Sequence, residues 1–427
     1  MQEDVFPAAE KILSEIENVL KKDPNLESFG IFPAEDNENK SPVLHEENAL
    51  GLASWCVKPL YCHVYNRLLN LRQSYHREEP ALVIRWLLGA LLLNPDVTTF
   101  WNMRREFVKN GRLNPQEELR FLSIVLYDKA KCFEIFSYRR WLLKLMLMDG
   151  KDLTSDAETL LRNEFQVTSM AAERYKNNSH AWSHRQQVLL MLESLCASRF
   201  YSILENEWEE STRWCNSHIS DYSGFSYRQF LLRKLLVQKQ HPKQPIPPAE
   251  ILTRRREIIN NFCVKNKNNN YILHDATCEQ VLNVLHKVNP KECPGVKYEQ
   301  TLINLSYWTE DCMFNEELIN MFPGHEALWN HRHYLVYSFI ALQNSYKNFY
   351  SYKPECFEPP RNLELFRNNS TVELVEKFSQ SPLTTAFWAR NKELNDTHKS
   401  TSRDDDPANR FITRNVLCNL KNGLQNK

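Results

Sequence analysis

The sequence predicts an all-α fold, built as a superhelix of helical hairpins. Two observations support this class: a low glycine content and a recurring pair of an aromatic residue and an arginine. Only 9 of the 427 residues are glycine, and 42% are hydrophobic, which fits a mostly helical chain better than a turn-rich β fold. An array of repeats can reach this length without one larger core, because it grows along a single axis.

The recurring pair is an aromatic residue followed three positions later by arginine, so that both lie on one helix face. Trp182 and Arg185 form the clearest copy, after Asn178, whose side chain can cap the helix N-terminus. The guanidinium can lie against the ring while it donates to a carbonyl or carboxylate of the next helix. We interpret the rings as core residues and the arginines as links between repeats. The copies are Trp101/Arg104, Phe136/Arg139, Trp182/Arg185, Phe225/Arg228 and Trp329/Arg332, with a weaker one at Phe387/Arg390.

The spacing of the aromatic anchors indicates the size of the repeat. The first three separations are 35, 46 and 43 residues, which suit one helical hairpin per repeat with loops of uneven length. The next separation is 104 residues, long enough for one degenerate copy and an insertion, and the last is 58.

Apolar residues at helical spacing predict the helices of the first half, and Asn, Ser and Pro mark their starts. Residues 34–50 are acidic and polar, which predicts a loop. The expected helices cover 5–22, 59–77, 81–93, the segment with Trp101, a segment starting at Asn114, 133–148, 155–175, a segment starting at Asn178, 197–215 and 225–239.

The second half is less regular. Four prolines between 242 and 248 predict a break in the array near 241–248. We expect a surface loop over 265–270, a motif helix from His325, disorder over 400–407 and a short closing helix over 408–420. Residues 345–360 receive no assignment.

Three regions follow from these features. An N-terminal helix and an acidic loop occupy 1–50, and the array of hairpins occupies 51–395. A polar, partly disordered tail occupies 396–427.

Composition excludes several classes of function. Lys and Arg together number 53, as do Asp and Glu, so the overall charge gives no case for nucleic-acid binding. The longest apolar run, 86–93, is far shorter than the roughly 20 residues that span a bilayer. The 11 cysteines include no CxxC pair, and no secretory leader is recognisable. We therefore expect reduced thiols, no transmembrane segment and a cytoplasmic location.

The chain contains no recognisable metal or phosphate motif. His325-Glu326 lacks the second histidine that an HExxH zinc site requires, because residue 329 is Trp. Cys56 and Cys62 are six apart, which suits buried thiols better than a metal pair. Arg254 to Arg256 read as a solvated helix face. We assign no metal ligand to this chain.

The repeats resemble those of protein prenyltransferase α-subunits. Residues 178–186 are similar to that family's repeat, Asn-x-x-x-Trp-x-x-Arg. Residues 131–140, Lys-Cys-Phe-Glu-Ile-Phe-Ser-Tyr-Arg-Arg, resemble its preceding repeat, Lys-Asn-Tyr-x-x-Trp-x-x-Arg-Arg. The resemblance covers about residues 85–235 and then 324–335.

The resemblance implies a right-handed, crescent-shaped superhelix wrapped around a separate β-subunit. In the family, that β-subunit holds the catalytic zinc and most of the lipid pocket. The divergent second half and the polar tail favour the α-subunit of a type III geranylgeranyltransferase, with geranylgeranyl diphosphate as co-substrate. The implied partner is the β-subunit of Rab geranylgeranyltransferase. The implied acceptors are proteins with C-terminal cysteines, such as a Golgi SNARE that already carries a farnesyl group.

The resemblance also implies roles for four residues. Lys131 matches a lysine near the isoprenoid diphosphate, where a cation can offset developing negative charge. Phe133, Asn178 and His180 are expected to bind substrate. Phe133 stands in place of a tyrosine, and Asn178 and His180 match residues that border the mouth of the active site. The chain departs from the family at Cys132 (Asn in the family), Asn177 (Lys), Ser179 (Tyr) and Thr98 (often Tyr).

Two other functions are compatible with helical repeats. The first is a non-catalytic scaffold of the tetratricopeptide type, although that repeat has a near-constant period of 34 residues and a Trp-x-x-Leu-Gly pattern. The second is an assembly partner that binds a prenyltransferase β-subunit without supporting transfer.

Overall fold

The computed structural model describes residues 6–35, 41–71, 78–149, 154–237, 248–263, 295–349 and 382–399. The chain divides into two compact units, Met1–Ala197 and Ser198–Lys427. The described residues form fourteen helices and one small sheet, which confirms the all-α class. The features predicted over 241–247, 265–270, 400–407 and 408–420 lie outside the described residues, as do residues 350–360, which received no assignment.

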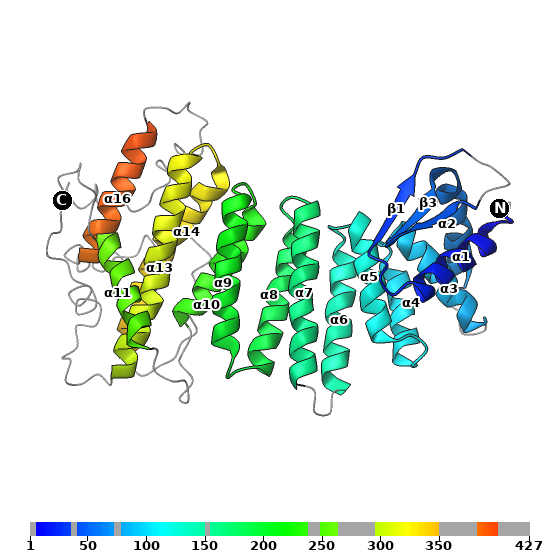
Figure 1. The fold of residues 1–427 in the computed structure, drawn as a ribbon, viewed down its shortest axis with the longest axis horizontal. Helices are drawn as coiled ribbons and strands as arrows, with labels where there is room; N and C mark the ends of the chain where they lie inside the picture. Colours follow the sequence, from blue (N-terminus) through cyan, green and yellow to red (C-terminus); the bar gives the residue numbers. More distant parts are fainter. Residues whose placement is uncertain are drawn as a thin grey trace. The chain divides into compact units, whose positions relative to one another are not determined.

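Unit 1 consists mainly of antiparallel helices arranged as hairpins (Figure 1). Helices α6, α7 and α8 pack side by side, and their starts agree with the sequence prediction to within a residue. Asn114 caps α5 by accepting hydrogen bonds from the Gln116 and Glu117 amides. The helices of this unit are α1 (Ala9–Lys22), α2 (Ser54–Asn70), α3 (Pro80–Leu93), α4 (Thr98–Lys109), α5 (Pro115–Asp128), α6 (Phe133–Asp149), α7 (Thr154–Arg174) and α8 (Ser179–Leu195).

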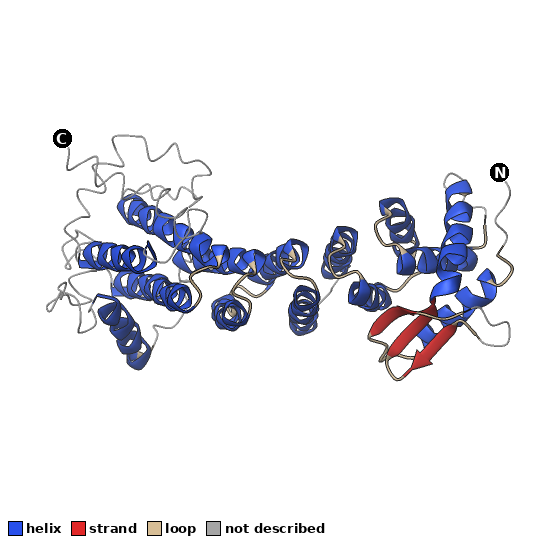
Figure 2. Cartoon of the chain, turned by 90° about the horizontal axis from the view of Figure 1, so that it is seen from above, coloured by secondary structure: helices blue, strands red, loops and turns tan. Residues whose placement is uncertain are grey.

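A three-stranded sheet replaces part of the expected N-terminal loop (red in Figure 2). Its strands are β1 (Ser28–Phe32), β2 (Val43–Glu46) and β3 (Ala49–Ala53), in the order β1-β3-β2. β3 pairs parallel with β1, with Gly30 opposite Gly51, and antiparallel with β2. The prediction of a loop over 34–50 was therefore wrong for its last residues. Acidic residues suggested a loop, but Leu50, Leu52 and Ala53 are buried and supply the apolar face that a strand needs.

Helix α1 closes the first end of unit 1 by packing on α3. Its apolar stripe buries Leu13, whose side chain fills the space beside Gly89, where a Cβ atom would lie only 2.3 Å away. Two acids fix the helix at its edge: Glu17 accepts a hydrogen bond from Arg85 at 2.6 Å, and Glu10 accepts one from the Trp86 indole at 2.7 Å. The first helix thus covers an apolar face that would otherwise be exposed.

Unit 2 continues the same kind of hairpin with longer helices. Helix α14 begins one residue after the predicted His325 and extends to Phe349, so it includes the first residues of the segment that received no assignment. The helices are α9 (Phe200–Ser217), α10 (Tyr222–Val237), α11 (Ala249–Cys263), α13 (Gly295–Met321), α14 (Glu326–Phe349) and α16 (Pro382–Lys399).

Four of the motif arginines bond to a backbone carbonyl twenty residues earlier, on the preceding helix. In unit 1, Nη1 of Arg139 donates to the carbonyl of Leu119 at 2.7 Å. In unit 2, Arg332 donates to the carbonyl of Cys312 at 3.0 Å. The same offset joins Arg185 to Phe165 and Arg228 to Trp208. Because a buried guanidinium must satisfy five N–H donors, this bond fixes the two helices of a hairpin in one register.

A buried carboxylate joins each hairpin of unit 1 to the next. Glu164 on α7 accepts two hydrogen bonds from Arg139, at 2.9 and 2.6 Å, and one from the ring of His184 at 2.8 Å. Glu118 on α5 receives Arg104 and the hydroxyl of Tyr138 in the same way. The Tyr or His residue precedes the motif arginine and lies twenty residues after the carboxylate. The pattern therefore includes a third member that the sequence prediction missed.

The carboxylate of Glu164 is charged in the folded chain. Burial by itself raises the pKa of this group, but the charge of Arg139 and the hydrogen bonds from His184 and Arg139 outweigh that effect and lower the pKa to about 2. Burial lowers the pKa of His184, which favours the neutral imidazole. Asp311 serves Arg228 and His331 in unit 2, at 2.6 and 3.1 Å, and its pKa is lowered for the same reasons.

Two details of the arginine prediction need correction. Arg185 does lie over its own Trp182, at 5.8 Å. In contrast, Arg104 lies over Phe121 of the following helix, α5, and Arg228 lies over Trp208 of the preceding helix, α9. These arginines reach toward a neighbouring helix, so each guanidinium packs against an aromatic ring of that helix. Arg255 is also not on a solvated face: it covers the Tyr307 ring at 4.0 Å and pairs with Glu310 at 3.4 Å.

Candidate functional site

The four residues with expected roles lie at two neighbouring turns of unit 1. Lys131 and Phe133 belong to the turn between α5 and α6, and Asn178 and His180 belong to the turn between α7 and α8. Both turns precede a motif helix. The hairpin register described above brings these turns together, although they are more than forty residues apart in the sequence.

Asn178 holds the two turns together. Its side-chain oxygen caps α8 by accepting from the Ala181 amide at 3.1 Å. Its side-chain nitrogen donates to the carbonyls of Ala130 and Ala171, at 2.7 and 3.1 Å. The side chain is fully buried, with 0% of its surface exposed. Asn178 therefore fastens the two turns to each other. Its side chain is buried in this chain, and its expected role in binding substrate stays a prediction.

Phe133 and His180 meet at the surface. The Phe133 ring is 50% exposed, and its centroid lies 5.5 Å from that of His180 in an edge-to-face arrangement. The guanidinium of Arg140 lies 5.9 Å from the centre of the same ring. Arg140 is half-buried. An exposed aromatic ring with a cation against it can bind an apolar chain and an anion side by side.

Lys131 is the exposed cation of this site. Its ammonium lies 4.5 Å from the centre of the Tyr175 ring. Among the described residues it has no hydrogen-bond or ion-pair partner, whereas the nearby Lys129 pairs with Asp128 at 3.0 Å. The charge of Lys131 is therefore available to an external anion. The sequence did not predict a role for Tyr175, although it lies three residues before the capping Asn178.

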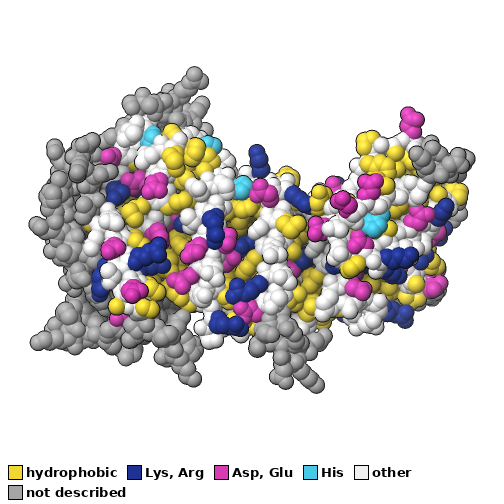
Figure 3. All heavy atoms as spheres, in the orientation of Figure 1, with side chains coloured by type: hydrophobic (Ala, Val, Ile, Leu, Met, Phe, Trp, Pro, Cys, Tyr) yellow, Lys and Arg dark blue, Asp and Glu magenta, His cyan; other side chains and the backbone are white. Residues whose placement is uncertain are grey.

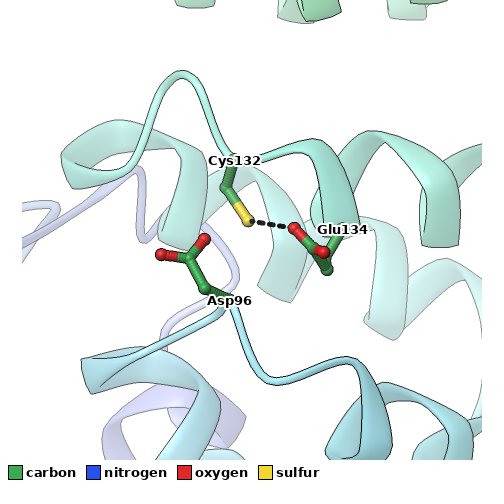
Figure 4. Close-up of side chains that lie close together, drawn as sticks. All are labelled: Asp96, Cys132 and Glu134. Atoms are coloured by element: carbon green, nitrogen blue, oxygen red, sulfur yellow. Dashed lines mark hydrogen bonds between the residues drawn. The ribbon is translucent and has the colours of Figure 1, made fainter.

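Cys132 lies close to two acidic side chains. Among the described residues, Asp96, Cys132 and Glu134 are the one group with metal-binding side chains at close range (Figure 4). In the chain by itself, burial raises the pKa of the Cys132 thiol to about 12. The Cys132 sulfur lies 3.7 Å from the carbonyl of Pro95, to which it donates. This arrangement suits a neutral thiol that fastens the turn.

One face of the molecule carries mixed charge. Side chains of Lys, Arg, Asp and Glu are interspersed over the face drawn in Figure 3, in line with 53 residues of each sign. Within the described residues, no helix combines the length and the apolar character that crossing a membrane requires.

Comparison with known proteins identifies the repeats. The family model described as "Protein prenyltransferase alpha subunit repeat" matches residues 115–146, 161–192, 204–235 and 308–339. Each match contains a carboxylate-bearing helix and the motif helix that follows it. The copies at Trp101 and Phe387 lie outside the matched segments.

Curated relatives extend the similarity over most of the chain. "Protein prenyltransferase alpha subunit repeat-containing protein 1" of Homo sapiens is 33% identical over 357 residues, covering 78% of this chain and 79% of the relative. "Protein prenyltransferase alpha subunit repeat-containing protein 1-B" of Xenopus laevis is 32% identical over 348 residues, covering 78% of this chain and 72% of the relative. "Geranylgeranyl transferase type-2 subunit alpha" of Mus musculus is 25% identical over 261 residues, covering 57% of this chain and 42% of the relative.

Proposed function

Because this chain belongs to the family of protein prenyltransferase α-subunit repeat proteins, we propose that it is the α-subunit of a protein geranylgeranyltransferase of type III. The observation that carries the proposal is Lys131, an exposed cation without an acidic partner among the described residues. It lies at the turn where the family resemblance expects contact with the isoprenoid diphosphate. The similarity to geranylgeranyl transferase type-2 α-subunits supports the choice of lipid.

The proposed reaction transfers the geranylgeranyl group from its diphosphate to a cysteine of the acceptor protein. The partner subunit would hold a zinc ion, and coordination to it would provide the acceptor cysteine as a thiolate, since a coordinated thiol loses its proton. A bond forms between the sulfur and C1 of the lipid, the bond from C1 to oxygen breaks, and diphosphate leaves. The ammonium of Lys131 offsets the negative charge that grows on the leaving oxygens.

The α-subunit family implies a partner of the β-subunit kind. We propose the β-subunit of Rab geranylgeranyltransferase as that partner, acting in the cytoplasm. Phe133 and His180 would form part of the wall at the mouth of the lipid site. The acceptor would be a protein with C-terminal cysteines, such as a SNARE that already carries one farnesyl group.

Reconstitution of the α/β pair tests the proposal directly. The chain is co-expressed with the proposed β-subunit, and incorporation of radiolabelled geranylgeranyl into the acceptor is measured. Lys131→Ala should lower kcat by on the order of ten- to a hundredfold, the range of one charge-assisted hydrogen bond. Ser220→Ala is the matched control, because Ser220 also lies five residues before a motif anchor, Phe225.

The outcomes separate the alternatives. A scaffold of the tetratricopeptide type would not co-purify with the β-subunit. An assembly partner would co-purify, yet no acceptor would become labelled. Labelling that survives unchanged in Lys131→Ala would remove the diphosphate role from this residue while leaving the subunit assignment in place.

A further inference from the structure

We infer that Tyr175 is a positioning residue, which holds the Lys131 ammonium in place for the diphosphate. The inference rests on the proposed function. The ammonium lies 4.5 Å from the centre of the Tyr175 ring, within the range at which a cation is attracted to the ring face. The contact joins the end of α7 to the turn before α6, two segments that meet only in the folded chain.

The backbones on both sides of this contact are fixed. Asn178 bonds to the carbonyl of Ala130, the residue before Lys131, and to that of Ala171. The Tyr175 amide also donates to the Ala171 carbonyl, at 3.2 Å. One buried amide therefore holds both the lysine and its platform. The remaining freedom lies in the flexible lysine stem, whose loss of rotamers a fixed ring reduces.

The Tyr175 ring is available to Lys131 because the neighbouring cation is occupied elsewhere. Arg174 lies over the ring of Tyr127, with its guanidinium carbon 3.4 Å from the centroid. Tyr175 remains 46% exposed, so a ligand can approach beside it. A ring attracts the ammonium without accepting its hydrogens as an oxygen would, so those donors remain available to phosphate oxygens.

Chemical labelling tests the contact without relying on activity. The full chain with its partner is treated with an amine-acylating reagent, and labelling of each lysine is measured by mass spectrometry. Tyr175→Leu should raise labelling of Lys131 about two- to fivefold, because the ring no longer stabilises its charged form. Tyr175→Phe keeps the ring and should match the wild type, as should Lys129 in every variant. Unchanged labelling of Lys131 in Tyr175→Leu overturns the inference.

A double-mutant cycle on geranylgeranyl transfer tests the consequence. Tyr175→Leu should lower kcat about two- to fivefold with the acceptor KM unchanged, and Tyr175→Phe should retain the rate. Tyr175→Leu should have no further effect when Lys131 is already alanine, because Tyr175 acts through Lys131. Additive effects would mean a structural role and would overturn the inference. Tyr127→Leu, which removes a ring of similar exposure beneath Arg174, is the control expected to leave the rate unchanged.

The two assays distinguish failure of this inference from failure of the proposed function. A wild-type pair that transfers no lipid rejects the proposed function and, with it, the role of Tyr175 in transfer. The labelling result then still decides whether Tyr175 holds Lys131. A wild-type pair that transfers lipid normally, with Tyr175→Leu equal to it in rate, rejects this inference alone.

Discussion

The motif helices of the two units share one buried register and differ at the turns that precede them. In unit 1, Glu164 joins Arg139 to His184; in unit 2, Asp311 joins Arg228 to His331. The buried parts thus use the same chemistry although a carboxylate of different length stands in each. Because both units stack helical hairpins, both need the same buried hydrogen bonds between neighbouring helices.

The turns have no such common requirement. Five residues before the anchor, unit 1 has Lys131, whose ammonium faces an exposed ring. Unit 2 has Ser220 at the same place, and its hydroxyl bonds to His325 at 2.6 Å. Hydrogen bonds tie neighbouring turns together in both units, and unit 1 in addition has the exposed charge of Lys131 at one of its turns. The two units therefore share the same kind of interior, while their exposed turns carry different chemical groups.

The largest expected effect tests whether the two buried carboxylates are equivalent. Glu164→Ala leaves Arg139 buried without its charged partner and should lower the free energy of unfolding of unit 1 by about 3–5 kcal/mol. Asp311→Ala should do the same to unit 2. Hydrogen exchange measured by mass spectrometry on peptides of each unit reports the two effects separately. Glu210→Ala removes an exposed ion pair with Arg213 and should cost at most about 1 kcal/mol. Losses confined to one carboxylate would refute the equivalence.

Acid should weaken the two units in sequence. The pKa of Glu164 is lowered from 4.5 to about 2, so its stabilisation is complete above pH 4.5 and is lost as the pH falls toward 2, in total about 3 kcal/mol. Asp311 starts from 3.8, so unit 2 should begin to lose protection at lower pH. Exchange rates per unit between pH 5 and 3 provide the measurement, and Glu164→Gln should flatten the profile of unit 1. Equal onset in both units would contradict this order.

A glycine distinguishes the first turn of helix α10 in unit 2 from the starts of α6 and α8 in unit 1. Directly before the anchor, unit 1 has Ile135 and Ala181, but unit 2 has Gly224, where a Cβ atom would lie 2.8 Å from the Trp214 ring. Gly224→Ala should therefore destabilise unit 2 by about 1–3 kcal/mol through overpacking, as measured by urea denaturation. Gly30→Ala, which meets nothing within 4 Å, is the control. Wild-type stability of Gly224→Ala would mean that the Trp214 ring can move aside.

The smallest expected effect concerns the tyrosines that donate hydrogen bonds to buried carboxylates in the two units. Tyr138 donates to Glu118 at 3.0 Å in unit 1, and Tyr227 donates to Glu207 in unit 2. Replacing either with Phe removes one hydrogen bond to a carboxylate and should cost about 1–2 kcal/mol. Urea denaturation gives the loss of unfolding free energy for Tyr138→Phe, Tyr227→Phe and the exposed Tyr222→Phe. A smaller loss for Tyr222→Phe would show that burial of the hydrogen bond sets its contribution to stability.

Much of the fold was predictable because it depends on local features of the chain. Asn178 and Asn114 cap the helices that their positions suggested, and the anchors and arginines at spacing three are buried. The carboxylates were not recognised, because Glu164 and Asp311 look like ordinary solvated helix residues until the neighbouring hairpin covers them. The sheet over 28–53 was missed because its strands have only four or five residues each and the segment between β1 and β2 is rich in charged residues.

The sequence by itself determined where hairpins begin, which residues face their interior and that Lys131 stands at a turn before a motif helix. Those properties follow from the helical period and from capping, which act over a few residues. Only the tertiary structure decided that the Tyr175 ring lies beneath Lys131, that Asn178 fastens both turns, and which acid meets which arginine. Those pairings depend on the register between helices, and packing sets that register over separations of twenty residues or more.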